Sequence, residues 1–148
     1  MCLVFPDPMA AIPRNHALAE MAEVSLEDLS RCPQILVGGG MPIGMLASAA
    51  FAQAGLPFRL CAHVPNTQQA CALVNAGVGV TLADTFTARN LHWPNVVMRP
   101  LKQEISIRAS LAYSRDPAPR PLAQKFAALL RRHAGGSEGA GVAGGDEA

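Results

Sequence analysis

The spacing of apolar and polar positions changes sharply between residues 33 and 57, PQILVGGGMPIGMLASAAFAQAGLP. Residues 34–37 form a short, apolar, β-prone run, which predicts a buried strand. Three glycines follow, and the apolar residues after them recur at helical spacing: Ile43, Leu46, Ala47, Ala50, Phe51 and Ala54. Pro42 suits the first position of a helix and Gly55 its left-handed stop. The stretch therefore predicts a strand, a glycine corner and a helix.

The same unit repeats once. Residues 58–64 (FRLCAHV) predict a second strand, residues 66–77 a second helix that Asn66 can cap, and residues 78–83 (VGVTLA) a third strand. Strands that alternate with helices through short connections pair in parallel by right-handed crossovers. We therefore predict an α/β fold, with one near-complete βαβαβ lobe whose sheet is covered by helices on both faces.

Shorter elements precede this pattern. Residues 9–13 (MAAIP) predict a strand that is closed by proline. Residues 25–29 (SLEDL) predict a single helical turn, in which Ser25 and Asp28 form a variant of the capping box.

Beyond Asp84 the pattern changes, which suggests that this part belongs to a different lobe. Two β-prone runs, at 95–101 and 104–114, precede a predicted closing helix at 122–133. The apolar side chains on one face of that helix are Leu122, Phe126, Leu129 and Leu130. The tail, residues 135–148, is rich in glycine and alanine and has no bulky anchor, so we expect it to be disordered.

The three glycines at 38–40 leave the backbone without side-chain cover, and their function could be to bind a ligand. A phosphate loop of the type GxxxxGK[ST] is excluded, because no Lys-Ser or Lys-Thr follows. The dinucleotide fingerprint GxGxxG is excluded too, because Gly44 falls one residue late and the acidic partner about 20 residues on is absent. What remains is general: at a strand-to-helix corner, free N–H groups and the helix dipole attract an anion or a polar ligand group.

A second corner of this kind follows the next strand. If the two strands are parallel neighbours, both corners face the crevice in which open α/β sheets bind ligands. The candidate ligand-binding residues are therefore Gly38, Gly39, Gly40, Met41, Asn66 and Thr67. Two simpler explanations stay open, namely glycines that serve only as a steric device and an Asn-Thr pair that serves only as a helix cap.

Composition narrows the function classes. The 148 residues carry a formal net charge of +1 and half are hydrophobic, which suits one compact domain or parts of two small lobes. The densest basic patch, residues 130–133 (LRRH), fits the C-terminal turn of a helix better than a nucleic-acid surface. No apolar run is long enough to span a membrane, and no export signal is visible, so we expect a cytoplasmic protein.

No constellation for catalysis or metal binding is visible. The cysteines, Cys2, Cys32, Cys61 and Cys71, form no CxxC pair, and no Cys/His group has zinc-like spacing. Cys61 and His63 share one face of a strand without a third group to orient them, so core packing is the expected role of Cys61 and Cys71. Since paired carboxylates are missing as well, we predict no enzyme, no metal site and no cofactor.

Taken in order, several motifs resemble the effector-binding domain of LysR-type transcriptional regulators. Residues 9–20 (MAAIPRNHALAE) are similar to the strand of that family that ends in a Pro-x-x-His-x-Leu-Ala signature, here Pro13, His16, Leu18 and Ala19. The runs AAFAQAGL (49–56) and ACALVNAGVGVTLAD (70–84) resemble segments that follow in the family. The resemblance extends from about residue 9 to residue 133.

The resemblance implies a fold of the type 2 periplasmic-binding-protein class. Residues 1–14 would end a first lobe, 15–83 would form the second lobe, 84–134 would return to the first, and 135–148 would be the tail. His16 would support the hinge region. Asp84 stands where the family usually has proline, and we expect it at the mouth of the ligand cleft.

The resemblance also implies a function. Family members bind a small effector between the lobes to control transcription as homo-oligomers, and residues 71–88 look most like the branch that senses amino acids and opines. We expect a small polar, amino-acid-like effector. The family's winged helix-turn-helix is missing from this sequence, so DNA contact is expected only through such a domain. The alternative on the same fold is a solute-binding protein of a transport system.

Overall fold

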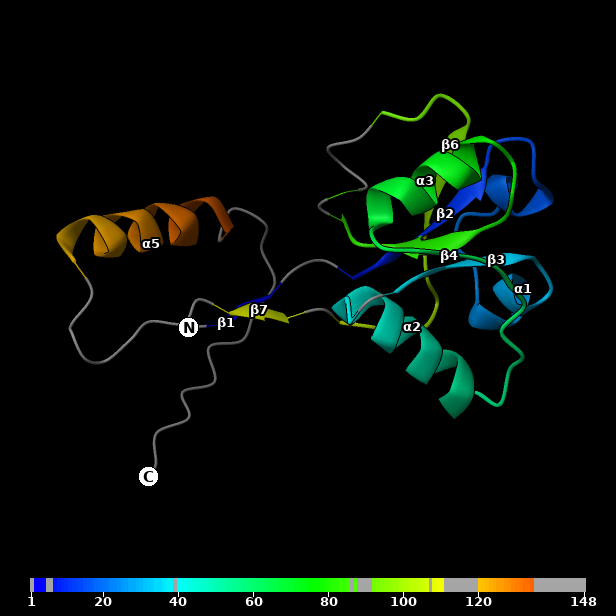
Figure 1. The fold of residues 1–148 in the computed structure, drawn as a ribbon, viewed down its shortest axis with the longest axis horizontal. Helices are drawn as coiled ribbons and strands as arrows, with labels where there is room; N and C mark the ends of the chain where they lie inside the picture. Colours follow the sequence, from blue (N-terminus) through cyan, green and yellow to red (C-terminus); the bar gives the residue numbers. More distant parts are fainter. Residues whose placement is uncertain are drawn as a thin grey trace. The chain divides into compact units, whose positions relative to one another are not determined.

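The computed structural model describes residues 2–4, 7–38, 40–85, 87, 92–106, 108–110 and 120–134. The chain divides into two compact units: Phe5–Ile107, and Met1–Val4 together with Arg108–Ala148. The larger unit contains the α/β core and both predicted corners (Figure 1). The two units are described separately.

The strands of the larger unit are β2 (Met9–Pro13), β3 (Gln34–Val37), β4 (Leu60–Val64), β5 (Thr81–Ala83) and β6 (Val96–Pro100). As predicted, β3 and β4 pair in parallel. β2 pairs antiparallel with β5 on one side and with β6 on the other. The strand predicted at 95–101 is therefore β6, and it belongs to this unit.

The third strand predicted in the βαβαβ pattern, at 78–83, pairs with β3 through one parallel bridge only. A parallel bridge links Gln34 with Val80, and the Ile35 N–H donates to the Val80 carbonyl at 2.8 Å. A Cβ on Gly79 would lie 2.5 Å from the Pro33 carbonyl oxygen, so only glycine permits this close approach. Residues 81–83 then form their ladder with β2, which the local pattern of 78–83 did not predict.

Two helices cover opposite faces of the β3–β4 pair, α2 (Pro42–Gln53) and α3 (Thr67–Asn75) (Figure 1). Pro42 occupies the first turn of α2, and Gly55 adopts a φ of +65° just past its end, as predicted. Gly77, with a φ of +78°, stands in the same place after α3. These punctuating residues confirm both predicted helices.

Two short helices precede β3. The single turn α1 (Leu26–Ser30) begins with the predicted capping box: Ser25 N–H donates to Asp28 Oδ2 at 2.9 Å, and Asp28 N–H donates to Ser25 Oγ at 3.1 Å. These bonds, the side-chain bond from Ser25 above all, lower the pKa of Asp28 below its ordinary value. A 3-10 helix, η1 (Ala17–Glu20), is capped by His16, whose Nδ1 accepts from the Leu18 N–H at 3.2 Å.

The hydrophobic core lies between the helices and the strands. Phe51 on α2 is buried, and its ring meets that of Phe58 edge to face, with ring centroids 5.1 Å apart. The other large side chains that are fully buried include Ile12, Leu29, Ile35, Val74 and Val80. β3 is therefore packed between the two helices, whereas β4 is exposed or half-buried along its whole length.

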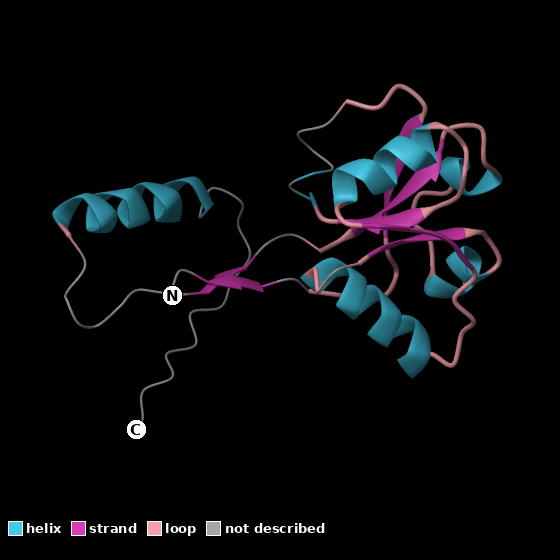
Figure 2. Cartoon of the chain, viewed as in Figure 1, coloured by secondary structure: helices cyan, strands magenta, loops and turns pink. Residues whose placement is uncertain are grey.

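The smaller unit contains β1 (Cys2–Val4), which pairs antiparallel with β7 (Arg108–Ser110), and α5 (Pro121–Ala134) (Figure 2). The predicted closing helix is confirmed, but its apolar face is not buried: Leu122 is 78% and Phe126 is 59% exposed. The tail at 135–148 lies outside the described residues, as do residues 107 and 111–114 of the predicted run at 104–114, of which 108–110 form β7. None of the described helices is long and apolar enough to cross a membrane.

Candidate functional site

The first corner leaves β3 at Gly38. The Gly38 N–H donates to the Val64 carbonyl at 2.8 Å, so parallel pairing continues one residue past the strand. Gly40 adopts a φ of +81°, a conformation that glycine alone adopts without strain, and Met41 then caps α2 without a side-chain hydrogen bond. Gly39 lies outside the described residues.

Few N–H groups remain at this corner for a ligand. The Gly38 N–H is engaged by β4, the Met41 N–H points to the Gly38 carbonyl at 3.4 Å, and Pro42 has none. The Gly44 N–H donates to the Met41 carbonyl at 3.1 Å. In the described part of the corner, at most Gly40 and Ile43 can therefore offer a free N–H at the positive end of α2.

The glycines have steric roles as well. A Cβ on Gly44 would lie 1.6 Å from the Val37 carbonyl oxygen, so Gly44 lets α2 approach the backbone of β3. A Cβ on Gly38 would lie 1.5 Å from His63 Nε2, because the exposed imidazole of His63 covers Gly38. Neither contact was predictable from the sequence, since each joins residues of different elements.

A groove of about 410 Å³ opens beside the first corner. It is mostly apolar, and two of its side chains are well exposed, Met41 at 40% and Met45 at 66%. With Ser48, these residues recur at helical spacing on α2, which is the signal by which sequence reasoning could have found them. The remaining lining comes from the corner and its flanks: Leu36, Val37, Gly38, Gly40 and Gly44.

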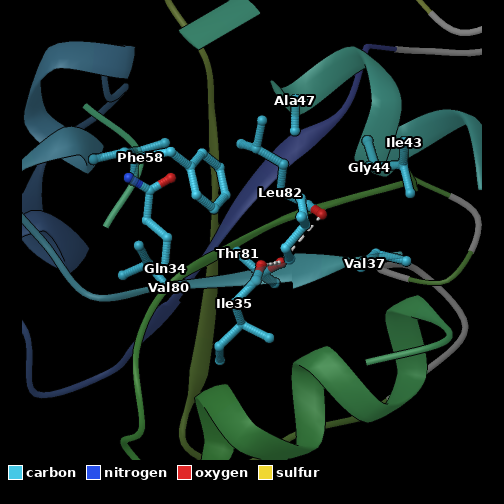
Figure 3. Close-up of a pocket in the computed structure, with 12 residues that line it drawn as sticks. Gln34, Ile35, Val37, Ile43, Gly44, Ala47, Phe58, Val80, Thr81 and Leu82 are labelled. Atoms are coloured by element: carbon cyan, nitrogen blue, oxygen red, sulfur yellow. Dashed lines mark hydrogen bonds between the residues drawn. The ribbon is translucent and has the colours of Figure 1, made fainter. Parts of the chain in front are cut away.

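A second, much smaller cavity of about 10 Å³ lies under α2, between that helix, β3 and β5 (Figure 3). Its wall includes Gln34, which is only 4% exposed and whose Nε2 has no hydrogen-bond partner among the described residues. Thr81 in the same wall is satisfied, because its Oγ1 donates to the Ile35 carbonyl at 2.8 Å. The volume is close to that of one water-sized probe, too small for any larger ligand.

The second corner is built around a carboxylate. Asn66 caps α3, with its Oδ1 accepting from the Gln69 N–H at 2.9 Å. Thr67 is buried and its Oγ1 donates to Asp84 Oδ2 at 2.7 Å. Asp84 also accepts from Thr87, from the N–H at 2.8 Å and from the hydroxyl at 2.9 Å. The structure therefore brings Thr67 and Asp84 together and occupies both with each other.

The two corners lie side by side. Val37 stands opposite Val64 in the parallel ladder, so the residues that follow each strand leave the sheet at the same end. Asn66 is exposed, and only its Oδ1 is used by the cap, which leaves Nδ2 free to donate to a ligand. Of the predicted site residues, Asn66 thus offers a side chain, whereas Thr67 and Asp84 are held inside the corner.

The cysteine thiols carry no nucleophilic arrangement in the described residues. Burial raises the pKa of Cys71 to about 11, and the nearby Asp84 carboxylate adds to this effect. Cys32 lies 3.7 Å from His16 Nε2, but His16 Nδ1 accepts a backbone N–H, which leaves the proton of the neutral ring on Nε2. His16 therefore cannot act as a base toward Cys32.

The expectation that Cys61 packs in the core is wrong. Cys61 is exposed, with its Sγ 3.8 Å from the Val78 carbonyl oxygen, whereas Cys71 is buried as expected. The physical reason is that β4 pairs only with β3 among the described strands and so lies at a sheet edge. The described residues also contain no group of three or more His, Cys, Asp or Glu side chains suited to a metal.

A parallel strand pair with a helix on each face, and with both strand-to-helix corners at one end, forms an α/β lobe. The chain superposes on LysR regulators and effector-binding domains, whose fold is of the type 2 periplasmic-binding-protein class. The family profile of the LysR substrate binding domain matches residues 3–135. The chain belongs to this family of effector-binding domains, as the sequence motifs indicated.

Known proteins agree with this assignment. The chain is 28% identical over 124 residues to the HTH-type transcriptional regulator XapR of Escherichia coli K12, covering 83% of this chain and 42% of XapR. The LysR family regulator HinK of Pseudomonas aeruginosa shares 23% identity and superposes with a TM-score of 0.74, over 90% of this chain and 48% of HinK. The effector binding domain of QuiR, in complex with shikimate, gives 16% identity and a TM-score of 0.68, over 91% and 66% of the two chains. This chain therefore spans less than half the length of XapR and HinK.

Proposed function

We propose that the adjoining corners at Gly38–Met41 and Asn66 bind the polar end of a small-molecule effector, and that this binding controls transcription. The observation that carries the proposal is the parallel register of β3 and β4, which sets two helix starts beside each other at one end of the lobe. Effector-binding domains of this family hold small molecules, as shikimate in QuiR illustrates.

The effector would meet donors at the corners and apolar surface beside them. The N–H groups of Gly40 and Ile43, at the positive end of α2, and the Nδ2 of Asn66 suit a carboxylate or another polar acceptor. The groove lined by Met41 and Met45 suits an apolar part of the same molecule. Thr67 and Asp84 act as positioning residues, because their hydrogen bond fixes the start of α3.

In this proposal the binding acts through a change of assembly. An effector shifts an equilibrium only by its differential affinity for the two states. We propose that these states are two arrangements of a homo-oligomer in the cytoplasm, which contacts DNA through a winged helix-turn-helix domain. An amino-acid-like effector remains the expected class. Family membership disfavours the alternative of a transport solute-binding protein.

The variant Asn66→Asp tests the proposal with little change in folding. Aspartate caps a helix as well as asparagine does, but it removes the Nδ2 donor and adds a negative charge at the corner. A panel of small carboxylates and amino acids, with shikimate included, would be screened by thermal shift and the best binder measured by calorimetry. We expect Asn66→Asp to weaken that binder about tenfold or more, the loss of one charge-assisted hydrogen bond.

The matched control is Gln53→Glu, which adds the same charge on the exposed last turn of α2. It should leave affinity unchanged. Equal affinity of the parent and Asn66→Asp, with equal melting temperatures, would show that Asn66 is only a cap. Failure of every compound in the panel to bind would count against the corners as an effector site.

A further inference from the structure

A polar hollow of about 400 Å³ lies at the opposite end of β2 from the two corners. β2 runs from Met9, which pairs with Ala83 beside Asp84, to Pro13, which pairs with Val96. Next to Pro13, the lining consists of Arg14, Asn15, Asn75, Ala76, Gly77 and Asn95. None of these residues belongs to the proposed effector site.

Arg14 is held in place without being neutralised. Its backbone N–H donates to the Asn95 carbonyl at 2.8 Å, and its Nε donates to the Pro94 carbonyl at 2.9 Å. Within the described residues no carboxylate forms an ion pair with Arg14. The terminal nitrogens Nη1 and Nη2 therefore keep their donors, and this planar fork matches the geometry of a carboxylate.

The amides beside Arg14 offer further donors. Asn75 Oδ1 accepts from the Asn95 N–H at 3.1 Å, which orients the Asn75 amide and leaves its Nδ2 to donate. The side chains of Asn15 and Asn95 are exposed at the same hollow. The side chains of Arg14 and Asn75 are thus already held by hydrogen bonds to the backbone, which reduces the conformational entropy that they would lose on binding a ligand.

The end of α3 supplies acceptors on the other side. The carbonyls of Ala72, Leu73 and Val74 accept hydrogen bonds from the N–H groups of residues 76–78, which end the helix. In contrast, the Asn75 and Ala76 carbonyls accept no hydrogen bond from the described residues. Free carbonyls at the negative end of a helix attract a cation. The hollow therefore combines a fixed cation with uncompensated acceptors.

We propose that this hollow binds a small zwitterion of the α-amino-acid type. Its carboxylate would pair with Arg14 and the Asn75 Nδ2, and its ammonium with the Asn75 and Ala76 carbonyls. A simple anion or a simple cation would leave one of these poles unpaired. The volume is within the range of small-molecule sites. The inference is independent of the proposed effector site.

Nitrogen-15 NMR of the full chain tests the proposal residue by residue. On titration with L-serine we expect saturable shifts at Asn75, Gly77 and Asn95. Two isosteric probes separate the poles: L-glycerate has a hydroxyl in place of the ammonium, and serinol has a hydroxymethyl group in place of the carboxylate. Each should bind about tenfold more weakly or worse, since each loses one charged hydrogen bond.

Three variants complete the test. Arg14→Gln should weaken the binding of L-serine about tenfold or more. The matched control Arg59→Gln removes an exposed arginine away from the hollow and should leave the affinity for L-serine unchanged. Asn75→Asp keeps the acceptor for the Asn95 N–H but repels a carboxylate, so it should weaken L-serine as well. Shifts confined to the corners, equal affinity for the three probes, equal effects of the two arginine variants, or no saturable shift would each overturn the proposal.

Discussion

The substitution Gly44→Ala tests how closely α2 must approach β3. The Cβ of alanine would lie 1.6 Å from the Val37 carbonyl oxygen, and the helix must retreat by about 1.4 Å to bring that separation to 3.0 Å. Because the obstacle is backbone, no side chain can turn away to relieve the clash. The retreat would also loosen Ile43, Ala47 and Phe51, which α2 buries on the same face.

Two effects of opposite sign determine how much Gly44→Ala changes the free energy of unfolding. Overpacking of a well-packed site typically destabilises by about 1–3 kcal/mol, and a shift of a whole helix belongs at the upper end of that range. Alanine favours the helix over glycine by about 1 kcal/mol. The free energy of unfolding should therefore fall by about 2 kcal/mol.

Urea unfolding followed by far-ultraviolet circular dichroism measures this loss. The control is Ala49→Gly on the exposed face of α2, which should cost about 1 kcal/mol from helix propensity alone. Helix propensity by itself gives the two substitutions opposite signs, whereas the close approach makes both destabilising. A Gly44→Ala chain as stable as its parent, or more stable, would refute the steric reasoning.

Three further predictions concern single groups. Asp28 has a lowered pKa in the folded chain. Its contribution to the free energy of unfolding is therefore complete above the ordinary pKa of 3.8 and is lost as pH falls through the lowered native pKa. Asp28→Asn should therefore be less stable than the parent near neutral pH, and urea midpoints should converge on acidification; a gap independent of pH contradicts this. Iodoacetamide at about pH 8 should alkylate exposed Cys61 and spare Cys71, as peptide mass mapping would show, because burial raises the Cys71 pKa to about 11. Comparable labelling of both would be inconsistent with the burial. Gln34→Leu should raise the free energy of unfolding by about 1–3 kcal/mol in urea titrations, since it removes an unpaired buried amide, whereas a decrease would show that the amide is satisfied.

The sequence predicted those features whose cause is local. The capping box at Ser25, the proline at the start of α2 and the left-handed glycines after α2 and α3 each act within a few residues, and all are present. The parallel pairing of β3 and β4 was predictable as well, because a short connection through one helix leaves few alternatives.

Features that depend on distant residues escaped prediction. β5 turns from β3 to an antiparallel ladder with β2, about 70 residues earlier in the chain, and no local pattern encodes that choice. The hydrogen bond that Thr67 donates to Asp84 joins residues 17 positions apart, and no local pattern predicted it. Cys61 looked like a core residue because its neighbours are apolar, but the edge position of β4 leaves it exposed.

Helix α3 has a consequence for how the lobe responds to its surroundings. Its nine residues span about 13 Å, with Asn66 at the first end and the Arg14 hollow at the last. If α3 moves as a rigid body, a ligand that displaces one end of the helix also displaces the other end. If binding at the Arg14 hollow changes the affinity of the corner at Asn66 in this way, thermodynamic linkage requires that binding at the corner changes the affinity of the hollow by the same factor.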